Sequence, residues 1–374
     1  MSVYIHIPFC EQRCYYCAFT VAVSPEGTWE PYVQRVLREI ELSGYRDEPE
    51  TIYFGGGTPS LVKPEMIARI LRKFHGTSKE VTIEANPGTI PSEKLARYRD
   101  MGITRVSLGA QSLEDEDLVK AGRLHKAHHV FDDFDALRKA GFTNINLDLI
   151  AGLPAQNFDV WSRNLDSVLG LRPEHVSVYM LDVEERSLWG KQVPDMTADE
   201  DYARFYIEAA NRLEAAGYVH YEISNWALPG RESLHNLRYW NGSRYRGFGV
   251  SAHSYEPYRR FWNTASLPEY AQRIDAGKPP VHQDELLTRE MRLEEAFMLG
   301  LRRMAGFDVS KIAKELDIHY PPEWYVRVRD LEQAGWIEFD GAILKLQPAG
   351  WVVASTITEE LLWPTPTSTF EATR

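Results

Sequence analysis

Cys10, Cys14 and Cys17 are the residues of this 374-residue sequence best suited to metal chemistry. The sequence contains three cysteines in all, and an odd number of thiols cannot pair completely as disulfides. A structural zinc ion usually has four ligands, so three thiolates would need a distant histidine. A 4Fe–4S cluster normally takes four cysteines, so three would leave one iron open to a small molecule. We expect the cluster, and the zinc site remains the alternative.

The elements that would position these cysteines alternate between strand and helix over about 220 residues. Apolar runs predict six strands, at Val3–Ile7, Thr51–Phe54, Val81–Ala85, Arg105–Leu108, Ile145–Ile150 and His175–Met180. Helical periodicity falls between them, near residues 28–44, 63–75, 91–100, 127–140 and 158–169. This order predicts a parallel sheet with right-handed crossovers. A complete barrel needs eight such units, so we predict an α/β fold with a partial (β/α)6 TIM-like barrel over residues 1–224.

Glycine and polar motifs follow the ends of these predicted strands. The cysteines follow the first strand, and Gly55–Pro59 (GGGTP) follows the second. Glu84 ends the third strand, Gln111 follows the fourth and Asp148 lies in the fifth. Ligands of parallel α/β folds bind at the carboxyl ends of the strands. We therefore expect all of these residues at one mouth.

The pattern changes after residue 224. Residues 225–283 are aromatic and are predicted to be rich in loops, because Asn-Gly, Pro-Gly and Gly-Phe-Gly sequences interrupt them. Residues 284–374 predict three helices, near 286–304, 309–316 and 322–333, and a hairpin around Asp340-Gly341. This order resembles a winged helix. Residues 281–374 nevertheless hold 10 Lys/Arg against 16 Asp/Glu, so we expect no nucleic-acid partner.

Composition narrows the class of protein further. The net charge is −12 and the pI is about 5.5, which does not favour a broad phosphate-binding surface. No apolar run reaches the roughly 18–20 residues of a membrane span, so we expect no integral membrane protein. Residues 1–9 lack the basic region of a signal peptide. Sparse, clustered cysteine is typical of a reducing compartment, so we expect a cytoplasmic protein.

The run Tyr4-Ile-His-Ile-Pro-Phe-Cys10-x3-Cys14-x2-Cys17 resembles the opening of the radical S-adenosylmethionine superfamily. Within it, residues 3 to about 362 resemble the branch of the oxygen-independent coproporphyrinogen III oxidases and the HemW-type heme chaperones. The resemblance implies a 4Fe–4S cluster whose open iron is chelated by the methionine part of S-adenosylmethionine. The cofactors would supply the electron chemistry, while the protein orients them and excludes water.

The resemblance also implies a set of S-adenosylmethionine contacts. The glycine-rich stretch would receive the methionyl amino group, and Glu84 would face a ribose hydroxyl or a cationic centre. Other polar side chains would complete the lining, and an aromatic residue would lie beside the cluster. The implied contacts are Tyr4, Gly56, Gly57, Thr58, Glu84, Gln111, Arg123 and Asp148.

Two later motifs point to heme. His235-Asn236-Leu-Arg-Tyr239-Trp240 resembles the HNxxYW signature that HemW-type chaperones carry and the oxidases lack. It implies that His235 ligates heme iron, with the neighbouring rings stacking on the porphyrin. Gly247–His253 (GFGVSAH) resembles the glycine motif that closes over the family's active-site mouth. We expect His6, His125 and His129 to be structural or to support other ligands, and not to be ligands themselves.

Two departures separate this chain from the oxidases. Their fourth cysteine, two residues after the third, is replaced by Phe19, and the N-terminal extension that wraps their substrate is not present before the first strand. We therefore expect a heme chaperone without coproporphyrinogen oxidase activity. It would bind heme and deliver it to heme-accepting proteins such as respiratory enzymes at the membrane surface.

The alternative is oxidative decarboxylation of coproporphyrinogen III. Basic residues near the mouth could bind its propionates, so charge alone leaves this alternative open. These residues are Arg123, Arg238, Arg244 and Arg246. The identity of a heme acceptor and the formation of a homodimer also stay open at this level.

Overall fold

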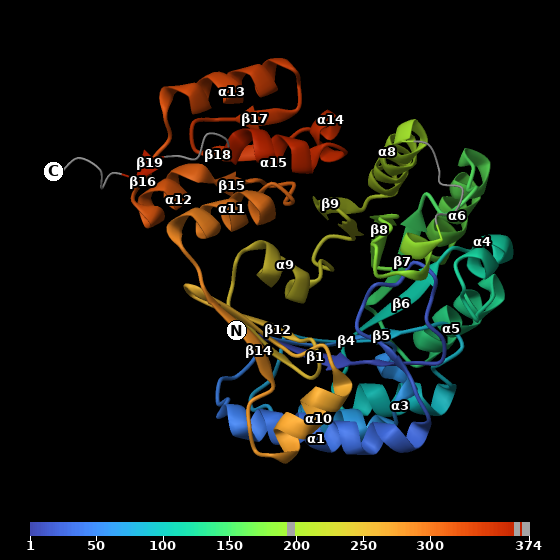
Figure 1. Cartoon of the computed structure of the whole chain (residues 1–374). Coiled ribbons are helices and arrows are strands. Elements are labelled where there is room, and N and C mark those ends of the chain that lie inside the picture. Colours follow the sequence, from blue (N-terminus) through green and yellow to red (C-terminus); the bar gives the residue numbers. More distant parts are fainter. Residues whose placement is uncertain (193–198, 363–366, 369–374) are drawn as a thin grey trace.

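The computed structural model describes residues 1–192, 199–362 and 367–368, and it arranges helices around one large curved sheet (Figure 1). Within these residues, twelve strands form that sheet in the order β14-β13-β12-β11-β1-β4-β5-β6-β7-β8-β10-β9. The sheet therefore joins β1, at the start of the described chain, to β11, which lies more than 240 residues later. Every helix among the described residues is too short or too polar to cross a bilayer.

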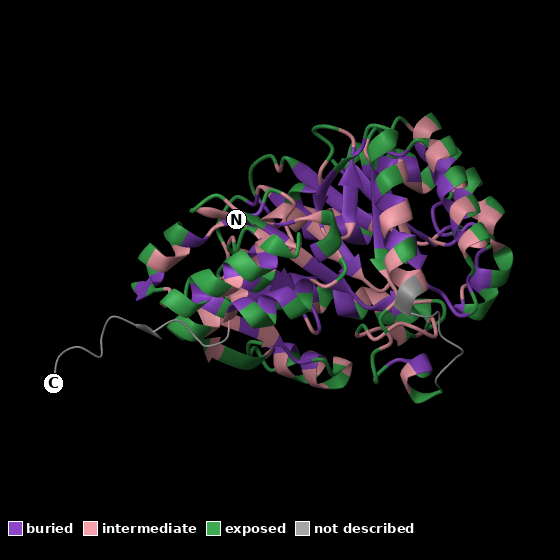
Figure 2. Cartoon of the chain, turned by 90° about the horizontal axis from the view of Figure 1, so that it is seen from above, coloured by how far each residue is buried: buried purple, intermediate pink, exposed green. Residues whose placement is uncertain are grey.

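Six parallel strands form the centre of the sheet. They are β1 (Ser2–Ile7), β4 (Thr51–Gly56), β5 (Glu80–Ala85), β6 (Arg105–Gln111), β7 (Ile145–Ala151) and β8 (His175–Met180). Each pairs in parallel with the next, which confirms the predicted partial barrel. In β1, Val3, Ile5 and Ile7 are fully buried on one face, and Ser2 and His6 are buried on the other, as expected of a parallel strand covered on both faces. Figure 2 shows this buried centre surrounded by helices whose outer faces are exposed.

The helices that connect these strands bury one apolar stripe each. α1 (Trp29–Ser43) buries Tyr32, Val33, Val36, Leu37 and Ile40, which recur at helical spacing, and it ends at Gly44 in the left-handed conformation. The other helices of this part are α2 (Pro64–Leu71), α3 (Ser92–Asp100), α4 (Asp115–Lys120), α5 (Ala127–Lys139), α6 (Phe158–Leu171), α7 (Leu188–Lys191) and α8 (Asp199–Ala215).

Residues 225–283 extend the sheet, whereas the sequence predicted a loop-rich connection. The region forms β10 (Asn225–Ala227), α9 (Leu234–Trp240), β11 (Tyr245–Phe248), β12 (His253–Glu256), β13 (Arg259–Asn263), α10 (Leu267–Asp275) and β14 (Val281–Leu286). β11 pairs in parallel with the free side of β1, and β12 to β14 continue the sheet as antiparallel strands. The strands are short and carry polar residues, so their apolar signal is weak. Their stability comes from partners that are distant in sequence.

The C-terminal residues form a separate hydrophobic core. It is built by α11 (Arg289–Gly300), β15 (Phe307–Asp308), α12 (Val309–Leu316), α13 (Pro322–Gln333), β17 (Ile337–Phe339), β18 (Ile343–Leu346), α14 (Pro348–Trp351) and α15 (Ala354–Leu362). The predicted hairpin is confirmed, because Asp340 Oδ1 accepts hydrogen bonds from the amides of Ala342 (2.9 Å) and Ile343 (2.7 Å). With the small sheet β15-β18-β17, the order of elements resembles a winged helix.

The two hydrophobic cores place the structural division near residue 287. The first core includes Trp226, Phe248, Tyr270 and Ile274, so residues 225–283 share the core of the first 224 residues. In Figure 1 the C-terminal helices lie above the sheet, while α1 and α10 lie below it. Short elements complete the described chain, namely β2 (Phe9–Cys10), β3 (Ala22–Val23), β9 (Val219–Glu222), β16 (Ile318–His319), β19 (Thr367–Ser368) and the 3₁₀ turns Glu26–Thr28 and Pro59–Leu61.

Candidate functional site

The cysteine loop begins where β1 ends. Its first turn is held by backbone hydrogen bonds to the next strand end, from the amide of Gly57 to the carbonyl of Ile7 (2.8 Å) and from the amide of Thr58 to that of Phe9 (2.7 Å). Further along, the amide of Tyr15 donates to the carbonyl of Ala121 (3.1 Å). The loop is thereby tied to the loops after β4 and β6. These contacts place the three thiols over the carboxyl ends of the parallel strands.

The thiols line a cavity of about 400 Å³, which we call the cysteine pocket. It brings together residues from the ends of five strands, as the sequence predicted. Its lining includes Cys10, Cys14, Cys17, Gly56, Gly57, Glu84, Asn86, Gln111, Arg123 and Asp148. Thr58 is buried beside it. The structure thus unites these predicted residues, and their roles as ligands remain predictions.

The environment of the thiols fits an iron–sulfur cluster better than a single ion. Burial raises the pKa of Cys10 to about 11 and also raises the pKa of Cys17, so binding of metal would have to displace protons. Among the described residues, no three His, Cys, Asp or Glu side chains are close enough to hold one metal ion. A cluster spreads its thiolates over different irons and does not need that closeness. The zinc alternative therefore lacks its ligand set.

A partly buried guanidinium, that of Arg123, connects the thiols to the polar lining. Arg123 donates from Nη1 to Cys14 Sγ (3.4 Å) and from Nη2 to Asn86 Oδ1 and to the carbonyl of Gly109 (both 2.7 Å). Asn86 in turn donates to Thr58 Oγ1 (2.8 Å), which donates to Cys10 Sγ (3.7 Å). One hydrogen-bonded chain therefore reaches two of the three thiols.

Asn86 is a pocket residue that sequence reasoning did not single out. It lies two positions after Glu84, and residues two apart in an extended strand share a face. That spacing was the available signal, because a residue sharing the face of Glu84 would point into the same mouth.

Two half-buried carboxyl groups, those of Glu84 and Asp148, line the cysteine pocket. Glu84 accepts hydrogen bonds from Tyr53 Oη (2.8 Å) and from the amide of Gly56 (3.1 Å). Burial raises its pKa to about 7, and the nearby Asp148 adds to the rise. Burial also raises the pKa of Asp148, which accepts from Ser107 Oγ (3.1 Å). Carboxylates in this setting are complementary to a cationic ligand.

Gln111 reaches the cysteine pocket through an unusual backbone conformation. Its φ is 67°, and the pairing of β6 with β7 is irregular between Leu108 and Gln111. For a residue other than glycine this left-handed conformation costs on the order of 1–3 kcal/mol and is found preferentially at functional sites. The residue thus leaves the regular strand where its side chain enters the pocket.

Gly56, at the end of β4, and Gly57, directly after it, have a packing role that the sequence did not reveal. Gly56 has a φ of 114°, and a Cβ there would lie 2.5 Å from Cε1 of His6. A Cβ at Gly57 would lie 2.6 Å from the carbonyl oxygen of Phe9. A side chain at either position is therefore excluded by β1 or by the cysteine loop, whether or not a ligand is bound. A bulky substitution at Gly56 would strain the fold as well as the pocket.

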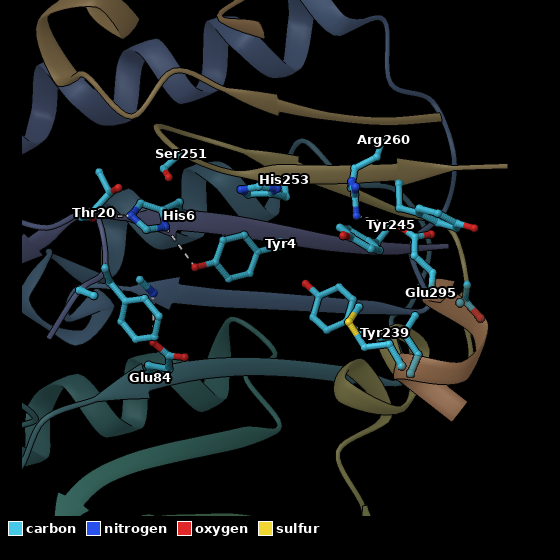
Figure 3. A pocket seen from close by; sticks show the side chains of 18 of the residues that line it. Tyr4, His6, Thr20, Glu84, Tyr239, Tyr245, Ser251, His253, Arg260 and Glu295 are labelled. Atoms are coloured by element: carbon cyan, nitrogen blue, oxygen red, sulfur yellow. Dashed lines mark hydrogen bonds and ion pairs between the residues drawn. The ribbon is translucent and has the colours of Figure 1, made fainter. Parts of the chain in front are cut away.

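A second cavity of about 630 Å³, which we call the aromatic pocket, adjoins the first (Figure 3). Its lining includes Tyr4, His6, Phe19, Arg186, Tyr239, Tyr245, Ser251, His253, Tyr255, Arg260, Glu295, Met298 and Leu299. Ala18, Phe19, Gly56 and Glu84 line both cavities. Tyr4 lines the aromatic pocket, and its hydroxyl contacts His6 Nδ1 at 3.1 Å. Its predicted position beside the cluster stays a prediction.

His235, the predicted heme ligand, lies behind the aromatic pocket. Its side chain is 1% exposed, and burial lowers its pKa to about 3. Nδ1 is hydrogen-bonded to Thr51 Oγ1 (2.8 Å) and Nε2 to Tyr239 Oη (2.9 Å). Tyr239 lines the pocket and His235 does not. Ligation of heme by His235 would require one of these two hydrogen bonds to break, and the other could persist and orient the ring.

His253 lines the aromatic pocket and was not weighed as a ligand from the sequence. It is exposed on β12 and stacks on Trp262 of β13, with ring centroids 5.3 Å apart and planes at 17°. Partial burial of its ring, together with the charge of Arg260, lowers the pKa of His253. The available signal was its position at the end of the glycine motif that the sequence placed at the mouth.

The arginines of the aromatic pocket differ from those predicted at the mouth. Arg238 pairs with Glu50, and Arg246 lies over the ring of Phe261 at 4.7 Å. The lining instead includes Arg260 and Arg186. Arg260 bonds Glu285 (2.7 Å) and Glu295 (2.6 Å), and the exposed Arg186 bonds Glu184 (3.0 Å). Glutamates thus balance both cations.

Comparison with known proteins agrees with this architecture. A family model described as the Radical SAM superfamily matches residues 4–166, and one described as the HemN C-terminal domain matches residues 287–353. The solved structure of coproporphyrinogen III oxidase (HemN) from Escherichia coli has a TM-score of 0.84 at 23% identity, covering 96% of this chain and 89% of the oxidase. At that identity the likeness shows the fold.

Curated relatives are more similar in sequence. The chain is 35% identical to the heme chaperone HemW of Bacillus subtilis over 95% of this chain and 97% of the relative. It is 30% identical to the heme chaperone HemW of Lactococcus lactis over 96% and 97% of the two chains. Because these matches span nearly the full length of both partners, the chain belongs to the HemW family of radical SAM proteins.

Proposed function

We propose that this protein is a heme chaperone that binds heme and transfers it to acceptor proteins, and that it carries a 4Fe–4S cluster with S-adenosylmethionine. The observation that carries the proposal is its similarity over nearly the full length to relatives named heme chaperone HemW. The pair of adjoining cavities supports it, because one is lined by thiols and the other by aromatic rings.

In this proposal Cys10, Cys14 and Cys17 hold the cluster. The S-adenosylmethionine contacts are Gly56, Gly57, Thr58, Glu84, Gln111, Arg123 and Asp148, which lie in or beside the cysteine pocket. When bound, the cluster supplies single electrons to the sulfonium of S-adenosylmethionine. The chain does the positioning: Arg123 stabilises negative charge at Cys14, and the carboxylates of Glu84 and Asp148 attract the cationic sulfonium.

The aromatic pocket is proposed as the heme site. Its volume, about 630 Å³, lies within the roughly 300–1,000 Å³ of typical small-molecule sites, and its tyrosines offer flat surfaces to a porphyrin. Arg186 and Arg260 share its lining with Glu84 and Glu295, so these charges balance. Four propionates would favour a cavity with net positive charge, which supports heme over coproporphyrinogen III as its ligand.

The first experiment separates carriage from catalysis. Cluster-reconstituted protein is incubated anaerobically with S-adenosylmethionine, reductant and coproporphyrinogen III, and the porphyrins are separated. We expect no conversion by protein whose iron and sulfide content is complete. Formation of protoporphyrinogen would overturn the chaperone proposal in favour of the oxidase.

The second experiment measures delivery. Protein loaded with hemin is mixed with membrane vesicles that contain a heme-free respiratory enzyme, and the enzyme's heme absorbance is followed. We expect loading to be faster from the protein than from free hemin at the same concentration. Equal rates would argue against chaperone activity. A cytoplasmic location, which we also propose, would be contradicted by recovery of the protein outside the cell membrane after fractionation.

A further inference from the structure

A series of buried hydrogen bonds, which we call the relay, leads from the cysteine pocket to α9. Asn146 of β7 donates from Nδ2 to Asp148 Oδ1 (2.7 Å). Its Oδ1 is hydrogen-bonded to Nδ1 of His175 (2.6 Å), the first residue of β8. Nε2 of His175 is hydrogen-bonded to Tyr221 Oη (2.7 Å), which accepts from the amide of Ser233 (3.3 Å). The relay therefore begins at a carboxyl group of the cysteine pocket and ends at the N-cap of α9.

The direction of the relay is fixed when Asp148 is ionised. A carboxylate can only accept, so Asn146 must turn its Nδ2 toward Asp148 and its Oδ1 toward His175. His175 must then donate from Nδ1. Burial, together with the charge of Arg105, lowers the pKa of His175 well below its usual value, so the ring is neutral. Its Nε2 therefore accepts from the hydroxyl of Tyr221, and every donor of the relay points toward the carboxylate.

The members of the relay between its two ends are shielded from solvent. Asn146, His175 and Ser233 are at most 1% exposed, and Tyr221 is 9% exposed. Hydrogen bonds that are aligned in a low-dielectric interior polarise one another, and water does not compete for their partners. A change of charge at the carboxylate therefore alters the strength of the hydrogen bonds along the whole relay.

The far end of the relay holds the start of α9. Ser233 is the N-cap of this seven-residue helix. Glu80 of β5 accepts from the amides of Leu234 (3.0 Å) and His235 (3.1 Å), so the first turn is anchored to the sheet at two places. Tyr239 of the same helix lines the aromatic pocket. A change in how firmly the first turn is held therefore changes how firmly one wall of that pocket is held.

We infer, resting on the proposed function, that Tyr221 and His175 are positioning residues that link the two pockets, so that a cationic ligand at Asp148 raises the affinity of the aromatic pocket for heme. The sulfonium of S-adenosylmethionine keeps the carboxylate ionised, which strengthens the aligned hydrogen bonds and holds the start of α9 in place. No covalent bond forms or breaks in this step. Because coupled binding equilibria are reciprocal, heme should raise the affinity for S-adenosylmethionine by the same factor.

The test measures hemin binding with and without S-adenosylmethionine. Full-length, cluster-reconstituted protein is kept without reductant, so that S-adenosylmethionine stays intact, and hemin is titrated by difference absorbance. For wild-type protein we expect saturating S-adenosylmethionine to raise hemin affinity by about fivefold or more. Saturating S-adenosylhomocysteine, which lacks the positive charge, should change hemin affinity by less than about twofold. An equal effect of the two ligands would overturn the inference.

A pair of matched variants tests the route. Tyr221→Phe removes the hydroxyl that joins His175 to Ser233. It should reduce the enhancement of hemin affinity by S-adenosylmethionine to less than about twofold, while hemin alone binds within about threefold of wild type. Tyr218→Phe is the control, because it removes the hydroxyl of another buried tyrosine, which donates to the carbonyl of Pro173 (2.6 Å) outside the relay. It should keep the wild-type enhancement.

His175→Asn interrupts the same link from the other side and gives a second measurement if Tyr221→Phe does not fold. The shorter side chain can still donate to Asn146 but does not reach Tyr221, so the enhancement should again be lost. Enhancement that persists in both variants would run through the wall that the two cavities share, and the inference would be overturned. Loss of the enhancement in Tyr218→Phe as well would show a general loosening of the fold and would also overturn it.

Failure of the inference can be told apart from failure of the proposed function. If wild-type protein with a complete cluster binds both ligands and its hemin affinity is the same with and without S-adenosylmethionine, the link between the pockets is wrong and heme carriage stands. If wild-type protein binds no hemin, the proposed function fails and the link fails with it.

Discussion

The cysteine pocket and the aromatic pocket share Ala18, Phe19, Gly56 and Glu84, yet they are assembled in different ways. The cysteine pocket lies at the ends of consecutive parallel strands, and hydrogen bonds link its polar side chains. The aromatic pocket collects residues from β1, from residues 239–260 and from α11 of the C-terminal core. The cysteine pocket is therefore formed by the repeating βα units. The aromatic pocket depends on segments that are far apart in the sequence and come together only in the folded chain. The two sites should therefore respond separately to substitution.

Substitution of a thiol should give the largest effect and leave the aromatic pocket intact. In Cys14→Ser we expect iron and sulfide to be lost together, because the remaining two thiolates cannot hold a cluster. Hemin affinity of the protein should persist. Metal and sulfide analysis with a hemin titration checks both points. His253→Gln is the reciprocal control, since it should keep iron and sulfide, and full retention of both in Cys14→Ser would refute the cluster assignment.

Destabilising the C-terminal core should affect the aromatic pocket and leave the cysteine pocket unchanged. Phe297 is fully buried in α11, directly before Met298 and Leu299, and its ring packs against Phe307 at 5.0 Å. Phe297→Ala should cost about 3–5 kcal/mol of stability in that core. We expect hemin affinity to fall while iron and sulfide stay bound. Denaturant unfolding and a hemin titration measure the effect, and Glu294→Ala, exposed on the same helix, is the control. Unchanged hemin affinity would show that α11 does not contribute to the hemin site.

The carboxylate of Glu84, which lines both cavities, should make ligand binding in the cysteine pocket depend on pH. Burial raises the pKa of Glu84 from 4.5 to about 7, so its contribution to the stability of the empty protein is fully present below pH 4.5 and is lost as the pH rises through about 7. Affinity for S-adenosylmethionine should change in the opposite direction and increase across that pKa, because the ionised carboxylate attracts the sulfonium.

Glu84→Gln should remove most of this rise and weaken binding by about tenfold at pH 8. Equilibrium binding of S-adenosylmethionine at several pH values measures the dependence. Glu93→Gln, exposed on α3, should behave like wild type. A pH profile for Glu84→Gln that matches wild type would exclude this carboxylate as the source.

The smallest effect is expected at a shared residue. The side chain of Phe19 is 69% exposed and lines both cavities. Phe19→Ala should change stability by no more than about 0.5 kcal/mol. It should weaken hemin and S-adenosylmethionine by similar, few-fold factors, measured in parallel titrations. A loss of affinity for only one of the two ligands would show that Phe19 contributes to binding in one cavity only.

The cysteine pocket could be predicted because its signals are local. Each strand end carries its own motif, and parallel strands bring their ends to one edge. Glu84, Gln111 and Asp148 were therefore placed together correctly from spacing alone, and the partial barrel followed from the βα rhythm. The reason for Gly56 could not be predicted, because the excluded Cβ collides with His6 on a different strand.

The aromatic pocket could be predicted only in part, because its signals are distributed: the motif that ends at His253 was expected at the mouth, but the partners of its strands were not. The partner of β1 on its outer side is β11, and no periodicity in residues 245–248 indicates which strand they join. The HNxxYW motif predicted His235 as the ligand. In the structure Tyr239 of this motif lines the cavity, and His235 is hydrogen-bonded to Tyr239 without lining the cavity itself. Burial of one motif residue behind another cannot be read from their spacing.

The pairing of β1 with β11 can form only late in the synthesis of the chain. Tyr245 leaves the ribosome about 240 residues after its partner Ser2, which is roughly 12–48 s at about 5–20 residues per second. In that interval one edge of β1 has no strand beside it, which exposes the nascent chain to wrong pairing. The lining of the cysteine pocket is complete at Glu184, whereas the aromatic pocket needs residues up to Leu299. Each new copy therefore passes through a stage in which every residue that lines the cysteine pocket has been synthesised, while part of the lining of the aromatic pocket has not.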